Sequence, residues 1–321
     1  MKEAVEGTGL VFACASGDVT EKEAILWARA ETEGSVSFRY GTSPNLKKHR
    51  TSSSIRVGIE SDFTAHIPIR GLEPGKTYYY RAEVAGRSPG PVCKFVTPPR
   101  RDELVDVTFA FGGDTRENHQ PFRIMDAIRA QHPDFFLFLG DTIYADVGGA
   151  AVRLPEFWAK YRRNRDDVAT QRLLSETSVY VSWDDHEVAN NYHPDNPLAP
   201  IGRRAFFDYW PIRRNSQEPH RLYRSFRWGR ALELFILDTR QYRDVREGRI
   251  LGLRQKQWLL NGLASSDAVF KFVATTVPIS SPRAADKWGG FPRDRNEVLR
   301  TIEREKINGV VFLAADVHYA A

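Results

Sequence analysis

The chain has 321 residues, which leaves room for about two domains of roughly 150 residues each. Hydrophobic residues make up 41% and charged residues 27% of it, a composition that excludes collagen-like and low-complexity proteins. The formal net charge of +5 favours anionic ligands in general, but it does not indicate a dedicated nucleic-acid-binding protein. No apolar run is long enough for a transmembrane helix, and the first residues lack the layout of a signal peptide.

Residues 1–98 show the period-two alternation that is typical of half-buried β-strands. Apolar and polar side chains alternate over 36–40, 63–69 and 78–84, and Gly/Pro-rich turn signals separate these stretches. We therefore expect a small all-β sandwich at the N-terminus. A double proline follows, and it predicts a linker over residues 99–104 because proline cannot continue the interior of a sheet.

From residue 105 the pattern changes to apolar runs that alternate with amphipathic segments. We expect strands over 105–111, 135–139, 179–183, 231–237, 270–277 and 310–315, and helices from 121, over 154–172 and just before the last strand. The stretch 183–223 looks rich in loops. Strands that are apolar on both faces and alternate with helices predict an α/β domain over 105–321, with a layered β-sheet and flanking helices.

Aspartates follow five of these strands at the point where each one ends: Asp114, Asp141, Asp185, Asp238 and Asp316. Because ligands of α/β sheets gather at the carboxyl ends of the strands, these side chains are expected to converge. Converging carboxylates repel one another unless cations neutralise them, so the pattern indicates bound metal. His186 and His318 stand beside two of the aspartates and add nitrogen ligands or acids.

The local motifs support this interpretation. Gly140–Tyr144 places a phenol three residues after a carboxylate, and Trp183–Glu187 groups acids around a histidine. Asn190 and Asn191 follow as neutral oxygen donors. In Asp316–His318 two ligand types alternate, so both side chains can face the same side of an extended strand end.

These motifs resemble those of the alkaline phosphatase D family, within the calcineurin-like metallophosphoesterases, and the resemblance covers nearly the whole chain. Segments 16–20, 25–29 and 72–81 are similar to the family's fibronectin-III-like N-terminal sandwich. The catalytic part matches through 140–144, 183–191, 237–243, 255–258 and 316–318. In this family more strands normally follow the last motif, so the resemblance implies a chain that is truncated at its C-terminal end.

The resemblance implies a site with two or more metal ions. Fe(III) together with Ca is the expected combination, and Mn or Mg are the alternatives. It implies that Asp141 bridges the metals and that Tyr144 binds the ferric ion as a phenolate. Asp185 or Asn190 would hold the second metal. Asp316 and His318 would complete the cluster.

Asp114 is also carried over as a ligand, although the family often has cysteine at this strand end. The wider superfamily has a histidine two residues later, where this chain has Arg116. His119 on the same loop is the candidate to replace that histidine.

The implied activity is hydrolysis of a phosphoric ester by water, in line, without a covalent phosphoenzyme. A metal pair would activate the water and clamp the phosphoryl oxygens. His186 would face the substrate as an acid or a phosphate ligand. Arg240 is a candidate for a bidentate phosphate contact, and a surface ion pair with an acid such as Asp244 is the alternative.

The substrate class stays open between phosphate monoesters, diesters and phospholipids. The compartment is open as well, because the family is often exported. The oligomeric state cannot be read from the residues. The competing hypothesis is a non-catalytic, phosphoesterase-like scaffold that binds anionic polymers or surfaces.

The remaining residues are given structural roles. Asp238 is expected to orient Arg240 or a neighbouring loop, and Glu187 to support the ligands without binding metal. Cys14 and Cys93 are interpreted as small buried residues and not as a disulfide. The tryptophans are assigned to packing and three histidines to the surface or loops: Trp158, Trp210, Trp228, Trp258, Trp288, His49, His66 and His220.

Overall fold

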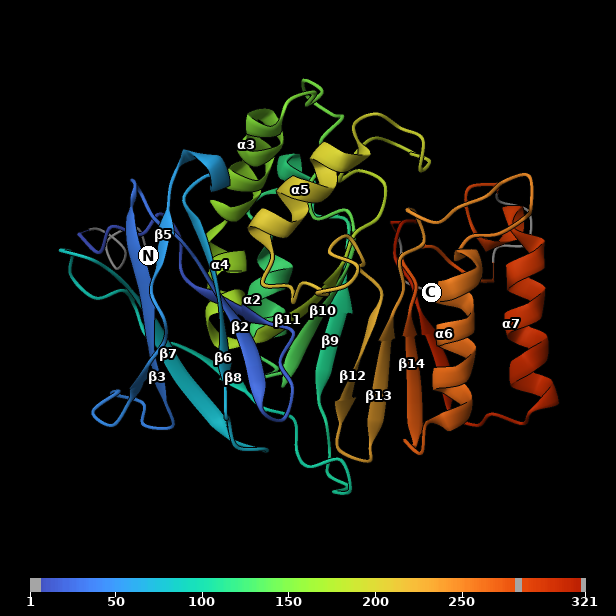
Figure 1. Ribbon diagram of the computed structural model, residues 1–321, viewed down its shortest axis with the longest axis horizontal. Coiled ribbons are helices and arrows are strands. Elements are labelled where there is room, and N and C mark those ends of the chain that lie inside the picture. The colour runs from blue at the N-terminus through green and yellow to red at the C-terminus, as the bar shows by residue number, and fades with distance from the viewer. Residues whose placement is uncertain (1–6, 281–284, 319–321) are drawn as a thin grey trace.

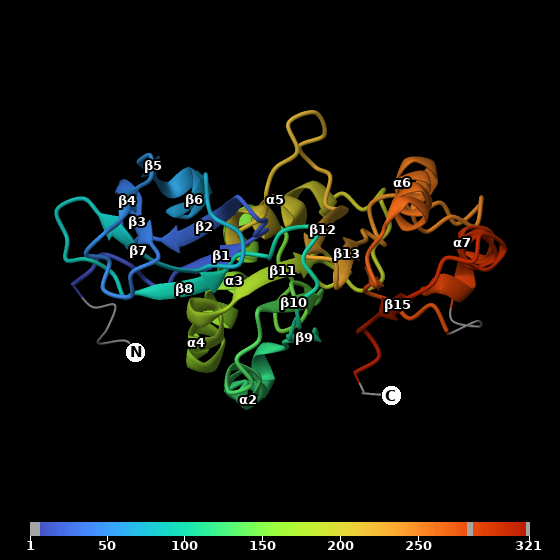
Figure 2. The same ribbon diagram turned by 90° about the horizontal axis from the view of Figure 1, so that it is seen from below.

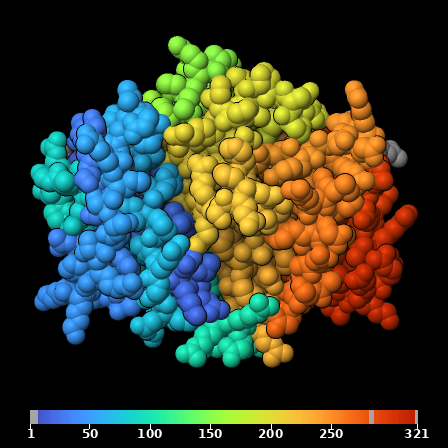
Figure 3. Space-filling view, in the orientation of Figure 1, coloured from blue at the N-terminus to red at the C-terminus, as the bar shows by residue number. Residues whose placement is uncertain are grey.

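Figure 1 shows a computed structural model of the chain, which describes residues 7–280 and 285–318. The C-terminal end, where the resemblance implies truncation, lies outside the described residues. Along the long axis of the molecule, N-terminal residues lie at one end, residues from the middle of the chain at the centre and C-terminal residues at the other end (Figure 3). None of the described helices combines the length and the hydropathy that crossing a membrane requires.

Fifteen strands are present in the described residues, and they form three sheets. Their bounds are β1 Ala15–Gly17, β2 Glu23–Arg29, β3 Gly34–Gly41, β4 Arg50–Thr51, β5 Ile55–Val57, β6 Thr64–Arg70, β7 Thr77–Val84, β8 Cys93–Val96, β9 Phe109–Gly112, β10 Phe135–Leu139, β11 Ser178–Ser182, β12 Arg224–Trp228, β13 Leu232–Ile236, β14 Phe270–Ala274 and β15 Val310–Leu313.

The helices lie between the strands of the second half. They are α2 Arg123–Arg129, α3 Leu154–Arg165, α4 Val168–Glu176, α5 Ala199–Tyr209, α6 Gly252–Ser265 and α7 Pro292–Arg304, with short 3-10 turns at η1 Ile59–Ser61, η2 Glu117–His119 and η3 Trp288–Gly290.

The part of the chain that follows residue 105 is a four-layer sandwich (Figures 1 and 2). Parallel strands β11, β10 and β9 face the sheet β12-β13-β14-β15, and apolar side chains of both sheets form a shared core. The ring of Phe109 on β9 lies edge-on to Phe272 on β14, with centroids 5.0 Å apart. Helices α2–α5 cover the outer face of the first sheet, and α6 and α7 cover the outer face of the second. The carboxyl ends of β9, β10, β11, β13 and β15 therefore meet along one edge.

The N-terminal strands form two layers around a core of their own. One layer, β6-β2-β1, also continues the sheet of β11, β10 and β9, because β1 pairs in parallel with β11 at Gly17 and Val179. A side chain at Gly17 would stand 2.7 Å from the Val179 carbonyl oxygen and from Pro211, so this close contact requires glycine. The expected linker separates the two segments in sequence, while the sheet joins them in space.

Several details differ from the sequence-based expectations. The 183–223 region is not all loop, since it contains α5, a helix with Pro200 in its first turn and a buried face that includes Phe206. The single helix expected over 154–172 is two helices, because the Asp167 carboxylate accepts a hydrogen bond from the Thr170 N–H (2.8 Å) and begins α4.

His66 was expected on the surface or in a loop, and that is wrong. It lies in β6, its ring Nε2 is buried with no hydrogen-bond partner among residues 7–280 and 285–318, and burial lowers its pKa to about 4. Cys14 and Cys93 are free and buried, as interpreted from the sequence. A hydrogen bond with the Cys14 thiol, together with burial, raises the pKa of Cys93 well above its usual value.

Candidate metal centre

The aspartates at the strand ends come together where the two sheets meet. Asp114 follows β9, Asp141 follows β10 and Asp316 follows β15. All three have left-handed backbones, with φ of 63°, 51° and 69°, so the chain turns sharply as it leaves each strand. Such backbone strain gathers at functional sites and persists only where the surrounding structure enforces it.

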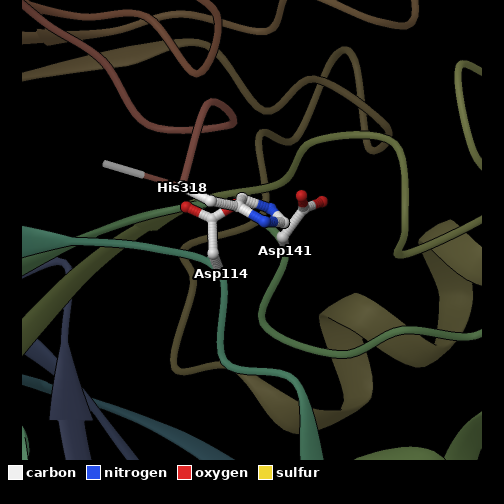
Figure 4. Close-up of side chains that lie close together, drawn as sticks. All are labelled: Asp114, Asp141 and His318. Atoms are coloured by element: carbon white, nitrogen blue, oxygen red, sulfur yellow. The ribbon is translucent and has the colours of Figure 1, made fainter. Parts of the chain in front are cut away.

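Three sets of side chains are close enough to hold a metal ion, with ligand atoms in each set within 4.8 Å of one another. The sets are Asp114, Asp141 and His318; Asp141, Asp185 and His186; and Asp184, Asp185 and Asp316. Asp141 belongs to the first two sets and Asp185 to the last two, so these two carboxylates link the sets into one chain. Figure 4 shows the first set, with the three side chains converging from three separate loops.

Tyr144 lies against the first set. Its hydroxyl is 3.2 Å from His318 Nε2, and the same nitrogen is 3.1 Å from Asp114 Oδ1. The Tyr144 ring also packs on His186, with centroids 4.2 Å apart. Burial and the nearby carboxylates, Asp141 first, raise the pKa of Tyr144, so the phenol stays protonated unless a cation is bound beside it.

The donor set fits a hard metal ion. Asp141 is 3% exposed, and burial together with its carboxylate neighbours raises its pKa well above the usual value. Asp184 Oδ2 is buried and accepts no hydrogen bond from any residue that the structure describes. Buried polar atoms rarely remain unpaired in folded proteins, and carboxylates with imidazole and phenol are ligands for Fe, Mn, Ca or Mg.

His186 forms a pair with Asp146, a residue that the sequence analysis did not select. Nδ1 of His186 lies 2.7 Å from Asp146 Oδ1. Asp146 Oδ2 also accepts the backbone N–H of Asn190 at 2.9 Å. Asn190 is exposed, and it contacts the site through this backbone hydrogen bond.

Two further acids act on the backbone, as the sequence analysis expected. Glu187 is fully buried and accepts the backbone N–H groups of Asp141, Thr142 and Asp184 at 2.7–3.2 Å. Asp238 Oδ1 accepts the backbone N–H groups of Arg240 and Gln241 and the indole N–H of Trp183, at 3.0–3.1 Å. Both residues shape the loops that carry the ligands.

Arg240 does not make the surface ion pair with Asp244 that was one alternative. Its side chain is 0% exposed, and its Nε donates to Asp184 Oδ1 at 2.6 Å. Its Nη1 donates to both oxygens of Asp286 at 3.1 Å, and its Nη2 is 3.6 Å from Asp185 Oδ1. Arg240 therefore lies behind the carboxylates and holds them in place.

Sequence reasoning missed the residues that supply charge from the loop before η3. Asp286 joins Arg240 to Arg243, whose Nη1 donates to it at 2.5 Å, and the next residue, Lys287, forms an ion pair with Asp316 through Nζ. No strand end or short motif marks this loop. Asp184 could have been found, because it stands next to Asp185 after the same strand.

A cavity of about 630 Å³ opens beside the first ligand set. Its wall includes Asp114, Tyr144 and His318 together with Arg116 and His119, and Phe111, Ala314 and Ala315 add apolar surface. His119, the candidate substitute ligand, thus lines the cavity, while the three ligand sets of the described residues form without it. The volume is in the range of small-molecule sites.

Two packed sheets with helices outside and acidic loops at the strand ends define a metallophosphoesterase-type fold. The sequence profile of the PhoD-like phosphatase family matches residues 109–321, and that of the PhoD-like phosphatase N-terminal domain matches residues 3–99. The chain therefore belongs to the PhoD-like phosphatase family, which confirms the resemblance noted from the motifs.

Known relatives agree with this assignment. Alkaline phosphatase D of Bacillus subtilis (strain 168) is 28% identical over 373 aligned positions, which cover 95% of this chain and 63% of the relative. A solved structure of PhoD is 25% identical and superposes with a TM-score of 0.89 over 98% of this chain and 72% of its own. The purple acid phosphatase PPD1 from yellow lupin seeds, at 12% identity, shares the fold with a TM-score of 0.68 over 96% of this chain and 59% of its own. This chain thus spans 63% of the length of the Bacillus relative.

Proposed function

We propose that this protein is a metal-dependent hydrolase of phosphate esters. The observation that carries the proposal is the linked chain of three ligand sets, in which Asp141 and Asp185 are each shared. The three sets contain five aspartates, and bound cations would offset the repulsion between their carboxylates. Membership of the PhoD-like phosphatase family supports the same activity.

Under this proposal Asp114, Tyr144 and His318 would hold one metal ion. Asp141 would be a ligand of this ion and of a second ion beside it. Asp185 and Asp316 hold the next ion, with Asn190 as a further candidate ligand. We keep Fe(III) with Ca as the first choice of metals and Mn or Mg as the others. Tyr144 is the ligand that favours Fe(III), because its phenol needs a strong Lewis acid to lose its proton.

The bound ions would activate water and stabilise charge on the phosphoryl oxygens. His186 would face the substrate as an acid or a phosphate ligand; the 2.7 Å contact between its Nδ1 and Asp146 Oδ1 supports this role, because it would hold the ring and leave Nε2 for the substrate. Arg240 has a different role from the one expected. As its donors point at Asp184 and Asp286, we assign it to positioning the ligands and not to binding phosphate.

The proposal also includes the domain division, with a fibronectin-III-like sandwich over 1–98, a linker over 99–104 and the catalytic part over 105–321. The N-terminal core supports the sandwich, and its sheet continues into the catalytic sheet.

The experiment is cleavage of a panel of phosphate esters, followed by phosphorus-31 NMR, after the protein has been loaded with Fe and Ca or with Mn. We expect metal-dependent release of phosphate. Full metal loading without turnover of any monoester, diester or phospholipid would contradict the proposal and favour the binding scaffold.

A further inference from the structure

Arg116 is a half-exposed cation of the cavity wall. It follows Asp114 by two residues and lines the cavity with Tyr144 and His318. Its guanidinium carbon lies 5.7 Å from the centre of the Tyr144 ring. Within residues 7–280 and 285–318, no carboxylate forms an ion pair with it and no acceptor takes a hydrogen bond from its side chain. The glutamate next to it, Glu117, faces Lys160 and Arg163 instead.

Two other cations near the carboxylates, Arg240 and Lys287, differ from Arg116 because both form ion pairs with aspartates. Arg240 is fully buried, its Nε and Nη1 are bound to Asp184 and Asp286, and its Nη2 lies 3.6 Å from Asp185, so its guanidinium does not line the cavity. Arg116 is half-exposed and faces open volume. Lys287 is also occupied, by Asp316. Of these three cations near the carboxylates, Arg116 alone is free to meet an anion that enters the cavity.

We propose that Arg116 determines substrate selectivity, by favouring phosphate monoesters over diesters. A monoester carries two negative charges near neutral pH, whereas a diester carries one. A guanidinium offers two parallel N–H donors that match two phosphoryl oxygens, and its attraction is greater for the dianion. The apolar part of the wall, with Phe111 47% exposed, leaves room for an uncharged ester group.

This inference rests on the proposed hydrolase function, which it refines. Removal of one charge-assisted contact weakens binding by about 10- to 100-fold. For Arg116→Gln we therefore expect kcat/KM for p-nitrophenyl phosphate to fall by about that factor. For bis(p-nitrophenyl) phosphate we expect a change of less than about threefold. Arg116→Lys should restore part of the monoester rate, because it keeps the charge but not the two-pronged donor.

The experiment uses the metal-loaded protein and compares Arg116→Gln with Arg123→Gln, which removes an exposed arginine at the start of α2. Metal content is measured for each variant, and titration calorimetry gives the affinity for inorganic phosphate. The expected result is weaker phosphate binding and an altered monoester-to-diester ratio in Arg116→Gln alone, with full metal content.

Three results would overturn the inference. An unchanged substrate ratio with undiminished phosphate affinity would show that Arg116 does not meet the anion. An equal loss on both esters, or a loss that follows missing metal, would assign it a structural role. A wild-type protein that is fully metal-loaded but neither binds phosphate nor cleaves either ester would reject the proposed function itself.

Discussion

At the scale of single residues, the crowding of carboxylates sets the energetics of the site. Lys287 is a positively charged neighbour of these carboxylates: its Nζ pairs with Asp316, and the residues on both sides of it make contacts of their own. Asp286 is held by Arg240 and Arg243, and the indole of Trp288 donates to Thr275 Oγ1 at 2.8 Å. The ammonium group therefore occupies a position where it offsets negative charge.

We predict that Lys287→Met lowers the melting temperature of the metal-free protein by roughly 2–6 °C. The reason is that Asp316 loses its counter-charge and repels its neighbours. Added metal ions restore the balance, so the metal-induced rise in melting temperature should be larger than in the wild type. Differential scanning calorimetry with and without metal measures both quantities.

Lys48→Met, on the exposed surface of the N-terminal sandwich, is the matched control and should leave both melting temperatures unchanged. An equal drop in the metal-free and metal-loaded forms of Lys287→Met would mean that Lys287 acts through general packing and not through the site charge.

At the scale of elements, Asp62 joins the N-terminal layer to two helices. It accepts from Arg29 at the end of β2 (3.0 and 3.2 Å), from Arg162 on α3 (2.7 Å) and from the Tyr209 hydroxyl on α5. Burial alone would raise the pKa of Asp62, but the hydrogen bonds from Arg29, Tyr209 and Arg162 outweigh it and hold this pKa below its ordinary value of 3.8.

We predict that Asp62→Asn lowers the free energy of unfolding by about 3 kcal/mol at pH 7, because it leaves the nearly buried Arg29 without its partner. A carboxyl with a lowered folded-state pKa contributes stability that is present above about pH 3.8 and is lost as the pH falls through the folded-state pKa. Urea unfolding between pH 7 and pH 3 should therefore show the gap between wild type and variant closing at the acid end.

Glu60→Gln, two residues away and exposed, is the control and should unfold like the wild type at every pH. A pH-independent gap for Asp62→Asn would contradict an ionic role for this carboxylate and indicate a steric one.

The elements also show what could be predicted from the sequence. Local apolar runs predict the strands that precede Asp114, Asp141, Asp185 and Asp316. Because parallel strands of one sheet end at the same edge, the sequence also predicts that these candidate ligands lie close together. Asp146 and Lys287 could not, because their roles depend on which loops fold against one another. The position of Arg240 was missed for the same reason, since its partner Asp286 is 46 residues away in the chain.

At the scale of the whole molecule, the two packed sheets contribute different side chains to the candidate metal centre. The first sheet supplies Asp114, Asp141 and Asp185, and the second supplies Asp316 and His318. The fold holds the sheets face to face through a shared aromatic core, so the distance between the two halves of the site is fixed by packing far from it. The N-terminal layer β6-β2-β1 extends the first sheet.

We propose that the carboxylates where the two sheets meet bind at least two metal ions and that Asp141 is a ligand of more than one of them. The direct test is the number of metal ions per chain, measured by inductively coupled plasma mass spectrometry on the wild type, Asp141→Asn and Asp106→Asn. Asp106 serves as the control because it is exposed and belongs to none of the ligand sets. We predict two or more ions in wild type and Asp106→Asn, and the loss of at least one in Asp141→Asn. Equal metal content in all three proteins, or none in any, would contradict the account.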